Sequence, residues 1–167
     1  MTMAATRIDR GSTATTTIYS EDGRLVFERR FAAPRAVVWR AFTDPELVPR
    51  WWGKHGSVTE VVEMDVRPGG RWRYISRAAD REDIVFFGEY LTVDAPRAYV
   101  WTFMFEFPGG VAGGPETHEF DEIDGGTLVR TIGDMGSREA LEGALASGMV
   151  EGALEAWERL EALLPEL

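Results

Sequence analysis

Hydrophobic and polar residues alternate most regularly between Tyr99 and Phe107, where five aromatic side chains share one parity. They are Tyr99, Trp101, Phe103, Phe105 and Phe107. A period of two is typical of a β-strand that buries one face. The same pattern predicts strands over residues 25–31, 58–66, 70–76, 84–93, 117–123 and 127–132. In 84–93 apolar residues occupy both parities, so the pattern does not assign its inner face.

Glycine and proline separate these strands. After the strand that ends at Val66, the hydrophobic register favours a three-residue loop, Pro68-Gly69-Gly70, which places Val66 opposite Trp72. Residues 108–115 hold four glycines and two prolines. We predict a loop there, because this composition is typical of connections between regular elements.

Three helices are predicted from apolar spacing and from capping residues. Pro34 suits the first position of a helix whose residues Val38 and Phe42 lie on one face. Asp44-Pro45-Glu46 starts a second short helix, with an N-cap, a proline at the first position and an acid in the first turn. Ser137 caps a long last helix, in which apolar residues recur every three or four positions. Those residues are Leu141, Leu145, Met149, Ala153, Trp157, Leu160 and Leu164.

This order of elements predicts an α+β fold with an antiparallel sheet of about six to seven strands, covered on one side by helices. Residues 1–22 are small and polar, with many threonines. We expect them to form a flexible arm, with a short edge strand at Thr15–Tyr19. Residues 23–167 are expected to form one domain, since no repeat or linker interrupts them.

Composition restricts the chemistry. The chain has no cysteine, which excludes disulfides, thiolate metal sites and cysteine nucleophiles. Its two histidines, His55 and His118, lie far apart in sequence, so we expect no metal site, and no motif suggests a cofactor. A net charge of −10 argues against nucleic acid and anionic membranes as partners. Neither a signal peptide nor an apolar run of membrane-spanning length is seen, so the expected location is the cytoplasm.

Five motifs follow one another along the chain: Phe31-x-x-Pro34-x-x-Val37-Val38-Trp39-x-x-Phe42-Thr43-Asp44-Pro45-Glu46-x5-Trp52, Asp65-x-Arg67-x-Gly69-Gly70, Gly88-Glu89-Tyr90, Thr102-Phe103 and a Gly152…Leu160-Glu161 ending. Together they resemble the activator of heat-shock-protein-90 ATPase homologue family, within the START-like (SRPBCC) superfamily. The resemblance covers about Arg24 to Leu164. It implies a START-like helix-grip fold, in which two short helices follow the first strand and a long C-terminal helix packs over the concave face of a curved sheet. It also implies a cavity for an apolar molecule. Some members of the superfamily are cyclases or hydrolases, and the eukaryotic namesake stimulates a chaperone ATPase.

Ten residues are candidates for the wall of such a cavity, since flat rings and adaptable methionines suit an apolar ligand. They are Trp52, Met64, Trp72, Tyr74, Trp101, Phe103, Phe105, His118, Met149 and Trp157. The same residues would equally form a filled core. Small residues in the last helix favour open space, because each helix glycine costs about 1 kcal/mol relative to alanine. Those residues are Gly143, Ala144, Ala146, Ser147, Gly148, Gly152 and Ala153.

Three ionisable residues are weak catalytic candidates. His118 shares its parity with Phe120 and could hydrogen-bond a ligand or carry a proton, or could be a satisfied core histidine. Glu60 shares its parity with Val58, so it would be a general acid or base if buried and an ordinary carboxylate if solvated. Glu89 lies on the strand of unassigned face.

Three functions therefore stay open. The leading hypothesis is a carrier or sensor that binds a small apolar molecule, such as a lipid or polyketide, as a monomer or homodimer. A second is a cyclase-like or hydrolytic enzyme that uses His118 with Glu60 or Glu89. A third is a co-chaperone-like module that contacts a chaperone through the acidic outer face of the last helix.

Overall fold

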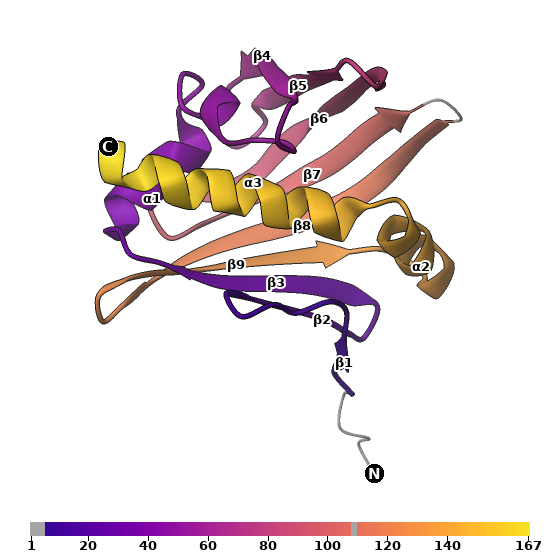
Figure 1. The fold of residues 1–167 in the computed structure, drawn as a ribbon, viewed down its shortest axis with the longest axis horizontal. Coiled ribbons are helices and arrows are strands. Elements are labelled where there is room, and N and C mark those ends of the chain that lie inside the picture. Colours follow the sequence, from indigo (N-terminus) through magenta and orange to yellow (C-terminus); the bar gives the residue numbers. More distant parts are fainter. Residues whose placement is uncertain (1–5, 108–109) are drawn as a thin grey trace.

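The computed structural model describes residues 6–107 and 110–167. In this part of the chain nine strands form one sheet, and each neighbouring pair is antiparallel (Figure 1). They are β1 (Ile8–Asp9), β2 (Thr16–Glu21), β3 (Arg24–Phe31), β4 (Val58–Met64), β5 (Arg71–Ala78), β6 (Arg81–Asp94), β7 (Ala98–Phe107), β8 (Gly110–Ile123) and β9 (Gly126–Asp134). Across the sheet their order is β1-β2-β3-β9-β8-β7-β6-β5-β4. The antiparallel α+β class is as predicted, and the expected number of six to seven strands is wrong.

Two of the additional strands come from the predicted N-terminal arm. β2 pairs with β3 along its whole length, and Ile18 in its middle is fully buried. β1 pairs in turn with β2, so β2 is an inner strand and not an edge. β1 and β2 therefore extend the sheet beyond β3, and residues 1–5 of the predicted arm lie outside the described residues.

β8 begins earlier than predicted. Residues 110–115, expected in a loop, pair with β7, so that part of the expectation is wrong. The glycines there allow a close approach of two backbones: a Cβ at Gly113 would lie 2.0 Å from the carbonyl oxygen of Phe103. Residues 108 and 109 of the predicted loop lie outside the described part of the chain.

The β4–β5 hairpin also differs from the prediction. Met64, and not Val66, lies opposite Trp72. A register shift between Val61 and Glu63 marks a β-bulge, which inserts one extra residue and reverses the parity of the strand. Val58 is therefore 68% exposed, although a strand without a bulge would bury it.

The helices are α1 (Arg35–Thr43), α2 (Arg138–Ala146) and α3 (Met149–Leu163), with single 3-10 turns η1 (Val48–Arg50) and η2 (Leu164–Glu166). The second predicted short helix is a turn followed by η1, because Asp44 Oδ1 accepts a hydrogen bond from the backbone N–H of Glu46 at 2.9 Å and holds that turn. The predicted long last helix is two helices. Ser137 caps α2 as predicted, and Gly148, with φ of +85°, separates α2 from α3.

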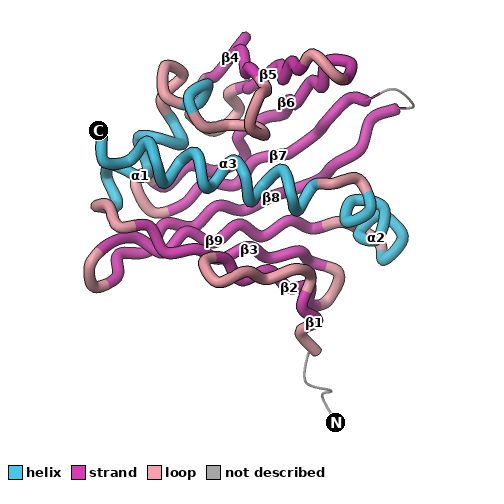
Figure 2. Tube along the Cα trace, in the orientation of Figure 1, coloured by secondary structure: helices cyan, strands magenta, loops and turns pink. Residues whose placement is uncertain are grey.

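α3 crosses the concave face of the sheet, with α1 at one end and α2 beyond the other end (Figures 1 and 2). Trp157 of α3 packs edge-on against Phe27 and Phe31 of β3. At the opposite flank, η1 lies against β4 and α3, and the loop after it is hydrogen-bonded to Thr59 of β4 and Arg159 of α3. α3 is thus held between β3 on one side and η1 with its loop on the other.

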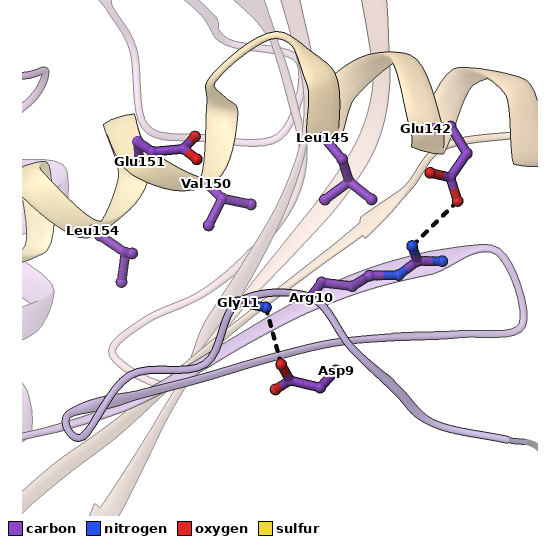
Figure 3. Close-up of a pocket in the computed structure, with 8 residues that line it drawn as sticks. All are labelled: Asp9, Arg10, Gly11, Glu142, Leu145, Val150, Glu151 and Leu154. Atoms are coloured by element: carbon purple, nitrogen blue, oxygen red, sulfur yellow. Dashed lines mark hydrogen bonds and ion pairs between the residues drawn. The ribbon is translucent and has the colours of Figure 1, made fainter.

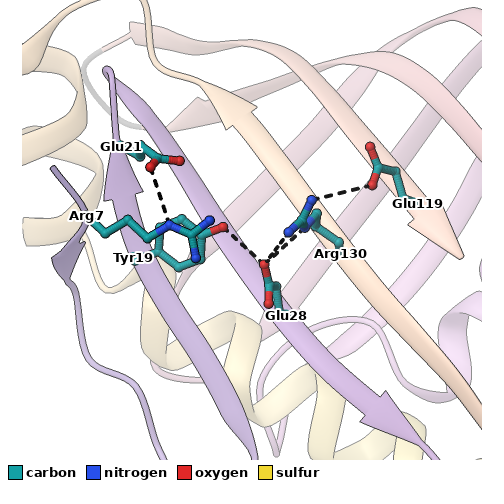
Figure 4. A network of polar contacts seen from close by, with 6 residues as sticks. All are labelled: Arg7, Tyr19, Glu21, Glu28, Glu119 and Arg130. Atoms are coloured by element: carbon teal, nitrogen blue, oxygen red, sulfur yellow. Dashed lines mark hydrogen bonds and ion pairs between the residues drawn. The ribbon is translucent and has the colours of Figure 1, made fainter. Parts of the chain in front are cut away.

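On the convex face, a polar network joins the N-terminal strands to the rest of the sheet (Figure 4). Glu28 accepts hydrogen bonds from the Tyr19 hydroxyl at 3.1 Å and from Arg130 Nη2 at 2.8 Å. Arg7 pairs with Glu21 at 3.3 Å, and its guanidinium lies 4.3 Å from the centre of the Tyr19 ring. These contacts link β2, β3 and β9, and tie the segment before β1 to β2.

Candidate functional site

The centre of the concave face is a stack of aromatic rings. Trp72 of β5 and Trp101 of β7 lie parallel with centroids 3.9 Å apart, and each is 1% exposed. Tyr74 packs against both rings, at 4.9 and 6.5 Å, and its hydroxyl donates to Sδ of Met64 at 3.6 Å. The strands place these side chains on one face because they share one parity. Here the predicted wall residues contact one another and form a filled core.

Trp52, from the loop after η1, inserts its indole among these rings. Its ring contacts six aromatic side chains at centroid distances between 5.2 and 6.4 Å. They are Trp51, Trp72, Tyr74, Phe86, Trp101 and Phe103. Trp52 is nevertheless only half-buried, so it lies where the aromatic surface passes from core to solvent.

Beyond Trp52 the aromatic surface continues as three half-buried phenylalanines. Phe103 lies 5.7 Å from Phe86 and 6.2 Å from Phe105, and Phe86 lies 6.4 Å from Phe105. We call these three residues the open aromatic patch. Phe86 belongs to β6, the strand whose inner face the sequence pattern left unassigned. The inner face of β6 carries Phe86, Gly88 and Tyr90, because Phe86 lies opposite Phe105 and cross-strand partners share a face.

Arg159 of α3 fixes the loop that carries Trp52. Its Nη1 lies 3.2, 3.1 and 3.3 Å from the carbonyl oxygens of Trp52, Gly53 and Lys54. Its Nη2 lies 3.4 Å from the carbonyl oxygen of Arg50. One guanidinium therefore donates hydrogen bonds to several carbonyl groups of a loop that is not paired with any strand. Sequence reasoning did not single out Arg159.

The remaining predicted wall residues lie elsewhere. Trp157 packs on β3, away from the Trp52 ring cluster, and Met149 is a half-buried residue in the first turn of α3. The glycines of the last helix have other roles than expected. Gly148 forms the break between helices, a Cβ at Gly143 would meet nothing within 4 Å, and one at Gly152 would lie 3.5 Å from Cε of Lys54.

A buried polar network surrounds His118. Its Nε2 lies 2.6 Å from Oε1 of Glu116, which also accepts the indole N–H of Trp101 at 3.0 Å. The other ring nitrogen, Nδ1, lies 3.2 Å from the Thr131 hydroxyl, and the imidazole stacks on Tyr99 at 4.6 Å. Sequence reasoning missed Glu116, although it shares the parity of His118 and Phe120 on β8. Because the sequence predicts a loop up to residue 115 and a strand only from Thr117, the shared parity of Glu116 and His118 is not evident from it.

The other two acidic candidates do not join His118. Glu60 is exposed on β4 and forms an ion pair with Arg77 at 2.6 Å. Glu89 is exposed on β6. His55 is also exposed, 3.7 Å from Glu158.

Three tyrosines of the core have strongly perturbed acidity. Burial raises the pKa of Tyr74, Tyr90 and Tyr99 above the ordinary value of 10.0, because a phenolate would lose its hydration there. All three hydroxyl groups are therefore neutral at physiological pH and can serve only as hydrogen-bond donors or acceptors.

A separate pocket of about 450 Å³ lies between the N-terminal segment and the break between α2 and α3 (Figure 3). Leu145, Val150 and Leu154 supply its apolar side. Arg10 crosses it to pair with Glu142 at 3.2 Å and also donates to Ser20 at 2.8 Å. None of the ten predicted wall residues lines this pocket.

Within residues 6–107 and 110–167, no group of histidine and acidic residues is arranged to hold a metal ion. No described helix is long and apolar enough to cross a membrane.

Residues 32–165 match the family described as Activator of Hsp90 ATPase homolog 1-like protein. Protein Ms6760 from Mycobacterium smegmatis shares 32% identity over 86% of this chain and 92% of its own, with a TM-score of 0.78. A protein from Rhodobacter sphaeroides gives 25% identity over 92% and 99%, with a TM-score of 0.83. One from Staphylococcus epidermidis gives 27% over 90% and 94%, with a TM-score of 0.77. No curated protein matches the chain.

Proposed function

Because the chain belongs to the Activator of Hsp90 ATPase homolog 1-like family, whose START-like fold is a ligand-binding fold, we propose that it binds a small apolar molecule at the open aromatic patch beside Trp52. One observation carries the proposal. The row of rings on β7 runs from fully buried Trp101 to half-buried Phe103 and Phe105, so part of a continuous apolar surface faces solvent. Such surfaces are typical of binding sites, because covering them releases ordered water.

The ligand would lie against Phe86, Phe103 and Phe105, with the indole of Trp52 at its inner end. Three aromatic rings offer flat contact area at low cost in side-chain entropy. Arg159 holds the loop that carries Trp52, so the indole forms a fixed inner end of the site. The chemical character of the patch favours a neutral or largely apolar molecule, since no charged side chain belongs to it.

The experiment uses the neutral fluorescent probe N-phenyl-1-naphthylamine and its displacement by decanol. We expect the probe to bind the unmodified protein and Phe103→Ser to weaken binding about tenfold or more, since a lost aromatic contact is worth about 1–2 kcal/mol. Val111→Ser is the matched control, because Val111 is an exposed apolar residue of the neighbouring strand on the opposite face. The proposal is wrong if the probe does not bind or if both variants weaken it equally.

A second candidate is general acid–base catalysis by His118, favoured by its 2.6 Å contact with Glu116. A carboxylate held at this distance orients the imidazole. Ester hydrolysis by the unmodified protein, lost in His118→Asn but retained in His55→Asn, would support this role. Equal rates in both variants would exclude it.

A further inference from the structure

Arg29 of β3 is the one arginine, lysine, aspartate or glutamate that is buried in the described part of the chain. It is 3% exposed and shares the inner parity of Phe27 and Phe31, whose rings contact Trp157 of α3. Removing a guanidinium from water is costly unless its charge is paired and its donors are satisfied. The contacts of Arg29 therefore show whether its charge is paired and its donors are satisfied.

Those contacts are incomplete. Nη2 pairs with a carboxylate oxygen of Glu161 on α3, and the guanidinium lies 5.3 Å from the centre of the Phe31 ring. Nε and Nη1 are buried and meet no acceptor among the described residues. Thr16, directly opposite Arg29 on β2, is 2% exposed, and its hydroxyl likewise has no partner there. Cross-strand partners share a face, so the unpaired hydroxyl and the unpaired guanidinium nitrogens point to the same side.

The chemistry of these groups defines what they would bind. A guanidinium donates in a planar fork that matches the two oxygens of a carboxylate, and a threonine hydroxyl can donate one more hydrogen bond to the same group. The surroundings are aromatic, since Phe31 and Trp157 lie beside the guanidinium. An anion bound here would therefore carry an apolar body.

We propose that Arg29 and Thr16 bind the carboxylate of an apolar acid between the sheet and α3. This site lies between β3 and α3, away from the open aromatic patch, so the inference goes beyond the proposed function and adds a second site, for an anionic headgroup. Glu161 stands in for the ligand carboxylate in the unliganded protein. Its side chain is 54% exposed, so it returns to water at low cost when the ligand takes its place.

The test compares decanoate with decanol, which have the same chain length and differ in the headgroup, at pH 8 and below micellar concentrations. Binding of both is measured directly by isothermal titration calorimetry. We expect decanoate to bind about tenfold or more tightly than decanol, because a hydrogen bond to a charged group contributes about 1.5–3 kcal/mol. Glu161→Gln removes the internal competitor and should raise the affinity for decanoate several-fold without changing that for decanol.

Arg29→Met should abolish the preference for decanoate. Arg29→Lys, which keeps the charge but loses the fork, should reduce it and provides the second variant if the first does not fold. Arg30→Met, at the exposed neighbouring position, should leave the preference unchanged. If decanol and decanoate bind equally well to the unmodified protein and to Glu161→Gln, this inference is wrong and the proposed function stands. If neither binds, this inference fails, while the proposed function is decided by the fluorescent probe at the open aromatic patch.

Discussion

Arg159 of α3 donates a hydrogen bond from Nη1 to the carbonyl oxygen of Trp52 across 3.2 Å. This contact joins residues 107 positions apart and holds the loop that carries Trp52. The indole of Trp52 lies where the buried part of the aromatic row ends. Helix and loop are thus coupled through one side chain. The position of Trp52 depends on α3 as much as on the rings around it.

We predict that Arg159→Gln lowers the free energy of unfolding by about 1–2 kcal/mol, because several carbonyl groups lose a charged donor. It should also make Trp52 more accessible to acrylamide, measured as increased fluorescence quenching. Urea unfolding gives the stability change. Arg138→Gln, at an exposed position in α2, is the control and should alter neither quantity; equal effects in both variants would contradict the role of Arg159.

A pair of glycine substitutions separates two roles of small residues in the last helices. Gly143→Ala should stabilise the protein by about 0.5–1 kcal/mol, because the helix gains a better helix former and the new methyl group meets no atom within 4 Å. Gly148→Ala should destabilise it by about 1 kcal/mol or more, because φ is +85° at that position. Thermal unfolding measures both. The same sign for the two changes would contradict this account.

Glu116→Ala should cost about 2–4 kcal/mol, since it leaves the indole N–H of Trp101 and His118 Nε2 without their shared acceptor in the core. Glu116→Gln keeps one acceptor oxygen and should cost less. The comparison is made by chemical denaturation with Asp121→Ala, an exposed change on the same strand, as reference. A loss in Glu116→Ala no larger than in the reference would show that the network contributes little.

Alkaline pH should destabilise the protein through its buried tyrosines. The pKa values of Tyr74, Tyr90 and Tyr99 are raised above 10.0 by burial, so the folded state holds their protons more tightly than the unfolded state. This contribution is complete below pH 10 and falls as pH rises above it, at about 1.4 kcal/mol per pH unit for each group. Stability against urea should therefore be constant from pH 8 to 9 and decline above 10.

Tyr90→Phe is the matched variant for this pH dependence. It removes one titrating group, so the decline above pH 10 should become less steep by the amount of one proton. Absorbance at 295 nm should show phenolate formation by the buried tyrosines only as the protein unfolds. An unchanged slope in Tyr90→Phe would show that its proton is not linked to folding.

Period-two alternation and helix caps predicted most of the fold correctly. β7, α1 and the start of α2 at Ser137 lie where the sequence indicated, because each depends on local pattern and local backbone chemistry. The resemblance of the motifs to a START-like family is confirmed by the family match over residues 32–165. The strand expected at Thr15–Tyr19 is present as β2, whereas β1 was missed because its two residues, Ile8 and Asp9, give no periodic signal in the sequence.

The errors at the site have a common physical origin. A bulge between Val61 and Glu63 changes the parity of β4, and no residue type in the sequence indicates such an insertion. Gly148 breaks the last helix, yet a glycine is equally compatible with a continuous helix or with close packing. The glycines before Glu116 are typical of a loop. In the structure they instead allow the backbones of two neighbouring strands to approach closely. Arg29 shares the parity of Leu25 and Phe27, which indicates the inner face, but the pattern of a single strand does not show the neighbouring elements that bury it.

The break at Gly148 makes the rotation of α2 about its own axis independent of the rotation of α3 about its axis. A residue inserted between Ser147 and Gly148 would displace α2 alone and leave every contact of α3 with the sheet in place. A residue inserted after Glu155 would turn the following part of α3 by about 100°, one step of 3.6 residues per turn. Arg159 would then leave its loop and Glu161 would leave Arg29, so a single added residue would break both of these polar contacts of the helix at once.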